Sequence, residues 1–107
     1  MLKNSNILIP VYKPFIGELE NSYVMDCMQS TWISSKGDYI GRFEKLFSKV
    51  TGIPQTTSCS NGTTAILLAL KALGLNSGDE VICPSLTYVA SAASIKHAGC
   101  TPVFVDA

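Results

Sequence analysis

The stretch Ser58–Leu73 reads Ser-Cys-Ser-Asn-Gly-Thr-Thr-Ala-Ile-Leu-Leu-Ala-Leu-Lys-Ala-Leu. Its second half consists almost entirely of strong helix formers, and Ser60 and Asn61 are preferred helix caps because their side-chain oxygens accept free backbone N–H groups. Gly62 lets a ligand come close to the backbone, and Thr63 adds a hydroxyl donor. The stretch predicts either an anion site at a helix start, phosphate above all, or a well-capped buried helix without a ligand.

The residues around this stretch alternate between strand-like and helical patterns. The expected order is strand, helix, strand, helix, strand, with strands at Thr56–Cys59, Glu80–Cys83 and Thr101–Val105 and helices at Ser60–Leu73 and Tyr88–Ala98. The strands are apolar throughout instead of alternating with polar residues, which is typical of a parallel sheet covered on both faces. The sequence therefore predicts an α/β fold with a mainly parallel sheet covered by helices.

Two turns come directly after predicted strands, at Ser60–Thr63 and at Ser85–Tyr88. In parallel sheets, ligands bind beyond the carboxyl ends of the strands, so both turns are expected at one edge. This favours the phosphate interpretation over the ligand-free helix. The sequence contains neither a G-x-G-x-x-G dinucleotide fingerprint nor a G-x-x-x-x-G-K-[ST] loop.

The first half of the chain is expected to be helical. A short apolar run at Ile7–Ile9 is stopped by Pro10. An amphipathic helix is predicted over Ile16–Trp32, then a loop, then a second helix over Tyr39–Val50 that ends at Gly52. We expect residues 1–54 to form an N-terminal helical arm and residues 55–107 to form a βαβαβ unit.

Composition excludes several classes of function. The 107 residues carry eight Lys and Arg and eight Asp and Glu, so no net charge favours nucleic acid or an anionic membrane as a partner. No run of 18 apolar residues or signal-type leader is present, so a cytoplasmic protein is expected. The four cysteines form no C-x-x-C pair and only His97 could assist them, so no metal site is predicted and the thiols are expected to be buried and reduced.

Several collinear blocks of the sequence resemble the sugar aminotransferases of the DegT/DnrJ/StrS type, and they extend from Pro10 to Asp106. They are Trp32–Gly37, Phe43–Phe47, Ser60–Thr63, Gly78–Ile82, Pro84–Tyr88 and Pro102–Asp106. The Trp-Ile-Ser-Ser-Lys-Gly form resembles the perosamine synthase-type members most. The chain also ends on a strand with no polar tail, so it looks like the N-terminal part of a longer protein.

The resemblance implies the first part of the large domain of a fold-type I enzyme that uses pyridoxal 5'-phosphate (PLP). Its substrates would be a nucleotide-linked 4-keto-6-deoxy sugar and glutamate, and it would act as a homodimer. Gly62 and Thr63 would bind the cofactor phosphate, and Tyr88 would stack on the pyridine ring unless it packs in the core. The substrate-binding residues would be Trp32, Ser34 and Ser35, in a loop near the active site that could reach the neighbouring subunit. Trp32 could equally be an apolar residue that packs at the end of a helix.

The resemblance carries no catalytic residue to this chain. Transamination with PLP needs a lysine that attaches to the cofactor and a carboxylate that keeps its pyridine nitrogen protonated. In the family both lie downstream of the equivalent of Asp106, so residues 1–107 alone are expected to be inactive. Two alternatives stay open: a sugar dehydratase of the same fold, with His in place of the lysine, and a non-catalytic regulatory or interaction fragment.

Overall fold

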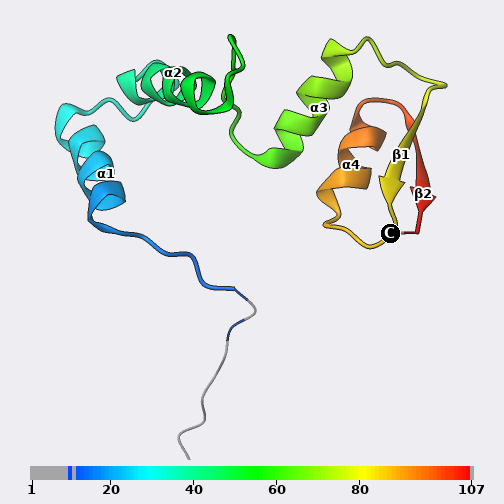
Figure 1. Ribbon diagram of the computed structural model, residues 1–107, viewed down its shortest axis with the longest axis horizontal. Helices are drawn as coiled ribbons and strands as arrows, with labels where there is room; N and C mark the ends of the chain where they lie inside the picture. Colours follow the sequence, from blue (N-terminus) through cyan, green and yellow to red (C-terminus); the bar gives the residue numbers. More distant parts are fainter. Residues whose placement is uncertain (1–9, 11, 107) are drawn as a thin grey trace, which may run out of the picture. The chain divides into compact units, whose positions relative to one another are not determined.

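The computed structural model of the protein describes residues 10 and 12–106, so the predicted apolar run Ile7–Ile9 lies outside the described residues. The elements in chain order are α1 (Glu18–Ser30), α2 (Asp38–Thr51), α3 (Gly62–Ala72), β1 (Glu80–Pro84), α4 (Ala90–His97) and β2 (Thr101–Val105) (Figure 1). The chain divides into two compact units, residues 1–41 and residues 42–107. No helix in the described part of the chain is long and apolar enough to cross a membrane.

The second unit contains a two-stranded parallel sheet. β1 pairs with β2 in a register that runs from Glu80 opposite Thr101 to Pro84 opposite Val105. α4 connects the two strands and packs against both of them as well as against α3. The prediction of an α/β fold with parallel strands and helical cover is confirmed.

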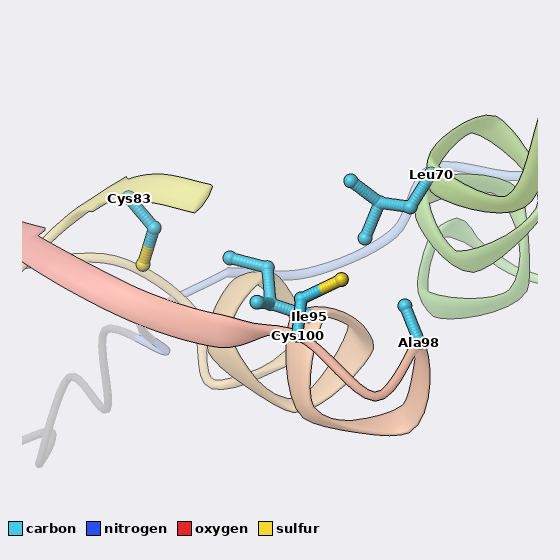
Figure 2. Packing of buried hydrophobic residues seen from close by; sticks show 5 residues of the cluster. All are labelled: Leu70, Cys83, Ile95, Ala98 and Cys100. Atoms are coloured by element: carbon cyan, nitrogen blue, oxygen red, sulfur yellow. The ribbon is translucent and has the colours of Figure 1, made fainter. Parts of the chain in front are cut away.

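The core of this unit lies where α3, α4 and the sheet meet (Figure 2). Its buried apolar residues are Leu70, Cys83, Ile95, Ala98 and Cys100. Burial of the Cys83 thiol is confirmed, and all four cysteines are free, but Cys59 is only half-buried. Part of the sheet is uncovered, because the side chains of Ile82 and Phe104 are 71% and 57% exposed.

The predicted strand at Thr56–Cys59 is wrong. These residues form no strand, and within the described residues β1 and β2 pair only with each other. A strand exists only where a neighbouring strand accepts its backbone hydrogen bonds, whatever its own residues favour. Here the N–H of Ser58 donates to a side chain of α2 instead.

The first unit consists of α1 and the chain on either side of it. α1 ends at Ser30 and is capped by Thr31, which has a left-handed backbone with φ of 63°, and a turn leads from there to α2. The hydroxyl of Tyr39, in the first turn of α2, donates to Asp26 at 2.9 Å. None of the residues of α1 is buried. The expected boundary at residue 54 lies just after the end of a helix, whereas the contacts divide the chain inside α2.

Candidate functional site

The start of α3 is capped by its own sequence. Asn61 has an extended backbone, and its side-chain oxygen accepts the backbone N–H of Thr64 at 2.9 Å and the hydroxyl of Thr64 at 3.0 Å. The Asn61 amide also donates to the hydroxyl of Ser60 at 3.3 Å. The first backbone bond of the helix runs from Ala65 N–H to Asn61 C=O. Residues 60–63, which we call the α3 turn, therefore form a regular helix cap, as the sequence predicts.

The cap leaves two backbone donors available. An α-helix has four N–H groups at its start without helical partners, and Asn61 accepts only the one from Thr64. The N–H groups of Gly62 and Thr63 have no acceptor within the described part of the chain. The first turn of α3 also contains no acidic side chain that could neutralise the positive end of the helix dipole.

Gly62 is not required by crowding or by backbone strain. A Cβ placed on this residue would find no atom within 4 Å, and Gly62 begins the helix without a positive φ. Glycine is the weakest helix former apart from proline, so its presence here gives no benefit to the fold itself. Open space beside two free N–H groups is the arrangement that a tetrahedral anion such as a phosphate group requires.

The α3 turn is held from α4 by a buried hydroxyl. Ser94 is fully buried, and its Oγ donates to the backbone carbonyl of Thr63 at 3.0 Å. Near the other end of the two helices, the Lys71 ammonium donates to the carbonyl of Ala98 at 2.7 Å. These two bonds fix the position of α3 along α4, so the α3 turn lies on a rigid support.

A carboxylate of α2 holds the chain that leads into the α3 turn. Oε1 of Glu44 accepts the backbone N–H of Ser58 at 2.8 Å and the hydroxyl of Ser58 at 2.9 Å. These bonds, the backbone N–H first and the hydroxyl second, hold the pKa of the Glu44 carboxyl below its ordinary value because they stabilise the ionised form. The hydroxyl of Thr56 donates to the backbone carbonyl of Glu44 at 2.8 Å. We call residues 56–58 the docking segment.

A hollow of about 350 Å³ lies beside the α3 turn. Its lining includes Phe43 and Phe47 of α2 and Asn61, Gly62 and Ala65 of α3. The two phenylalanine rings pack in a tilted arrangement with centroids 5.7 Å apart. Apolar rings of α2 therefore form part of the wall of the hollow beside Gly62.

Tyr88 precedes α4 and is not a core residue. Its side chain is 79% exposed in the described chain, so it does not pack in the core of this unit. In Figure 1, α3 and α4 run in one direction and both strands in the opposite one, so the helix starts and the strand ends face the same side of this unit. The α3 turn and the residues just before α4, which include Tyr88, therefore lie on that side. Among the described residues no strand precedes the α3 turn, so the prediction that both turns follow strands of the sheet holds only for the turn after β1.

The predicted substrate-binding residues lie in the first unit, in the turn between α1 and α2. Trp32 is 58% exposed, and Ser34 and Ser35 are exposed as well. The hydroxyl of Ser34 accepts the N–H of Lys36 at 3.3 Å, and the Ser34 carbonyl accepts the N–H of Gly37 at 3.1 Å. A Cβ on Gly37 would lie 3.2 Å from the Trp32 carbonyl, so this tight turn favours glycine there.

Sequence reasoning missed the two residues that support the α3 turn. Glu44 lies 14 residues before its partner Ser58, and Ser94 lies 31 residues after Thr63. Nothing in the local pattern of either residue indicates the partner. A serine among the apolar residues of a predicted helix was the available signal for Ser94, since buried hydroxyls need a hydrogen-bond acceptor.

The chain matches a family model over most of its length. The model of the DegT/DnrJ/EryC1/StrS aminotransferase family matches residues 14–107. The chain is 54% identical over 98 residues to GDP-perosamine synthase of Escherichia coli O157:H7, an alignment that covers 92% of this chain and 27% of that protein. It is 52% identical over 98 residues to GDP-perosamine synthase of Caulobacter vibrioides, covering 92% of this chain and 26% of that protein. The chain thus spans about a quarter of the length of these relatives.

Solved structures show the same relationship. A structure described as a candidate sugar aminotransferase of Streptococcus pneumoniae, in its PLP form, matches with a TM-score of 0.82 and 41% identity over 92% of this chain and 25% of that one. A GDP-4-keto-6-deoxy-D-mannose-3-dehydratase of E. coli, with bound hydrated PLP, matches with a TM-score of 0.77 and 27% identity over 91% of this chain and 26% of that one. Enzymes of two reaction types therefore share this segment of the fold.

Proposed function

Because this chain belongs to the DegT/DnrJ/EryC1/StrS aminotransferase family, we propose that it is the cofactor-phosphate segment of a PLP-dependent sugar aminotransferase. The substrate class is a nucleotide-linked 4-keto-6-deoxy sugar, and glutamate is the amino donor. The observation that carries the proposal is the start of α3, where Gly62 and Thr63 offer two free N–H groups beside open space. These residues fit the phosphate group of PLP. When bound, PLP would supply the electron-withdrawing ring that amino transfer needs.

The other site residues complete the proposal. Tyr88, exposed at the same side of the unit, stacks on the cofactor ring, since an exposed aromatic face beside a ligand edge suits a flat heterocycle. Trp32, Ser34 and Ser35 contact the substrate in a homodimer. Residues 55–107 serve as the cofactor-phosphate unit and residues 1–54 as an arm. The four free thiols suit the reducing cytoplasm, where we place the protein.

Two lysines of the described chain have other uses or places. Lys71 caps the carboxyl end of α4 through the carbonyl of Ala98, and Lys36 lies in the turn after α1. We assign no catalytic role to a residue of this chain. The family resemblance places the lysine that amino transfer requires beyond the equivalent of Asp106.

The experiment uses the protein expressed from its complete reading frame. Titration with PLP, followed by absorbance, is compared with titration by pyridoxal, which lacks the phosphate. Amino transfer is then measured with ¹⁵N-glutamate and a GDP-linked 4-keto-6-deoxy sugar. The proposal predicts PLP binding that depends on the phosphate and a sugar product that contains ¹⁵N. Equal binding of PLP and pyridoxal, or no labelled product, would contradict it.

A sugar dehydratase is the second candidate function. The observation in its favour is the TM-score of 0.77 to the E. coli 3-dehydratase, which shows that this segment of the fold serves that reaction too. The product separates the two candidates by mass spectrometry. An aminotransferase leaves nitrogen on the sugar, whereas a dehydratase removes an oxygen from the sugar and leaves it free of label. The identity of 54% to a perosamine synthase, against 27% to the dehydratase, favours the aminotransferase.

A further inference from the structure

The docking segment is held in place by hydrogen bonds to α2 and not by a sheet. Residues 56–58 form no strand, and four hydrogen bonds join them to α2. Two of these bonds end on a single atom, Oε1 of Glu44, which accepts both donors of Ser58. Hydrogen bonds to an ionised acceptor are roughly twice as strong as bonds between neutral groups. Glu44 is therefore the main attachment of this segment.

The docking segment leads directly into the α3 turn, so its position affects the anion site. α3 itself is fixed by its packing on α4 and by the Ser94 bond to Thr63, so the direction of its free N–H groups is set without Glu44. Asn61 is held to α3 by its own capping bonds, and Ser60 is bonded to Asn61. Cys59 has no such described bond, so the docking segment sets how the backbone enters the α3 turn next to the space outside Gly62.

We propose that Glu44 is a positioning residue for the cofactor phosphate. By holding Ser58, it keeps the backbone that enters the α3 turn out of the anion site and sets the affinity for PLP without touching the cofactor. This inference rests on the proposed function and extends it to a residue of α2.

The test compares three variants with the wild type, each expressed from the complete reading frame. Glu44→Ala removes both bonds to Ser58. Glu44→Gln keeps the side-chain length and one acceptor oxygen but removes the charge. The matched control is Glu80→Gln, the same chemical change at an exposed position of the second unit with no described side-chain bond. Dissociation constants for PLP and for pyridoxal are measured for each protein.

The expected result is a loss that depends on the phosphate. PLP affinity falls about tenfold in Glu44→Ala, which removes both bonds that hold Ser58, and falls less in Glu44→Gln. Pyridoxal affinity stays unchanged in both variants, and Glu80→Gln binds both ligands like the wild type. A purely structural role would instead lower the affinities for PLP and pyridoxal by the same factor, which would overturn the inference.

Amide hydrogen exchange provides a second measurement that does not involve the cofactor. The Ser58 amide is expected to exchange faster in Glu44→Ala than in the wild type, while the amides of α4 keep their protection. Unchanged exchange at Ser58, or an unchanged preference for PLP over pyridoxal in both Glu44 variants, would overturn the inference alone. A wild type with no preference for PLP would overturn the proposed function as well.

Discussion

The starts of α1 and α3 differ in whether a negatively charged side chain lies at the positive end of the helix dipole. At α1, the N–H of Gly17 donates to the carboxylate of Glu20 at 2.8 Å, and Glu18 adds a second negative charge in the first turn. At α3, a neutral asparagine forms the cap, the first turn has no acidic residue, and two N–H groups have no acceptor among the described residues. The first helix supplies its own anion. The third helix has no such anion among the described residues, and we propose that the cofactor phosphate occupies this place.

A helix start that binds an anion is expected to differ from one that is only well capped in its charge and in the space beside its free N–H groups. Both starts contain a glycine and a good capping arrangement, so neither feature alone marks a site. What distinguishes α3 is the lack of an internal negative charge and the open space at Gly62, together with three supporting bonds: two that Glu44 accepts from Ser58 and one that Ser94 donates to Thr63. At Gly17, by contrast, an added Cβ would lie 2.9 Å from the Glu20 carboxylate.

The largest expected effect comes from giving α3 the internal anion that α1 has. Thr63→Glu places a carboxylate in the first turn, where it interacts with the helix dipole and repels a phosphate group. We expect PLP affinity to fall roughly a hundredfold or more through like-charge repulsion at short range. The control is Thr63→Gln, which has similar size and no charge and is expected to lose much less. Equal losses in the two variants would show that size and not charge decides.

Filling the open space at Gly62 is expected to have the next largest effect. Gly62→Ala adds a methyl group where the described chain leaves room, so thermal unfolding should shift upward by the equivalent of about 0.5 kcal/mol from better helix propensity. PLP affinity should fall about tenfold because the methyl group keeps the phosphate away from the backbone. Gly41→Ala, in the open interior of α2, should raise stability without changing PLP affinity. Higher stability with unchanged PLP affinity at Gly62→Ala would argue against a phosphate beside this residue.

Removing the neutral cap of α3 tests the role of Asn61. Asn61→Ala loses the bond to the Thr64 N–H, and we expect the free energy of unfolding to fall by about 1 kcal/mol. Asn61→Asp keeps the cap but adds a negative charge, so it should preserve stability and still weaken PLP binding. Denaturant unfolding and PLP titration measure the two effects. Tighter PLP binding in Asn61→Asp would be incompatible with an anion site at this turn.

Acidification should release the docking segment, with the smallest of the four effects. Because the hydrogen bonds from Ser58 hold the pKa of Glu44 below its ordinary value, the carboxylate stabilises the fold above that ordinary value. This contribution is lost as the pH falls through the lowered pKa of the folded state. The difference in unfolding temperature between wild type and Glu44→Gln should therefore shrink toward zero as the pH falls well below 4.5. A difference that persists in acid would show that Glu44 acts through something other than its charge.

The features that could be predicted from the sequence are local. Asn61 caps α3, and Gly52 and Gly74 lie just after helix ends with φ of 74° and 78°. These caps could be predicted because each depends only on residues within one helical turn. β2 lies at Thr101–Val105 as predicted, because that apolar run has a partner strand in the chain.

The features that could not be predicted depend on contacts between distant residues. Thr56–Cys59 has strand-forming residues but no strand beside it among the described residues, so side-chain bonds to α2 hold it instead. The roles of Glu44 and Ser94 result from packing that brings residues 14 and 31 positions apart together. The conformation and the partners of such residues depend on tertiary contacts, which the neighbouring residues in the sequence do not indicate.

A crystal structure of the protein with PLP bound, expressed from its complete reading frame, would decide whether the start of α3 is the cofactor site. We expect phosphate oxygens at hydrogen-bonding distance, about 2.7–3.2 Å, from the backbone nitrogens of both Gly62 and Thr63. We also expect Glu44 to remain bonded to Ser58 in that complex. A phosphate group bound elsewhere, with the start of α3 facing only solvent, would show that this helix start does not hold the cofactor.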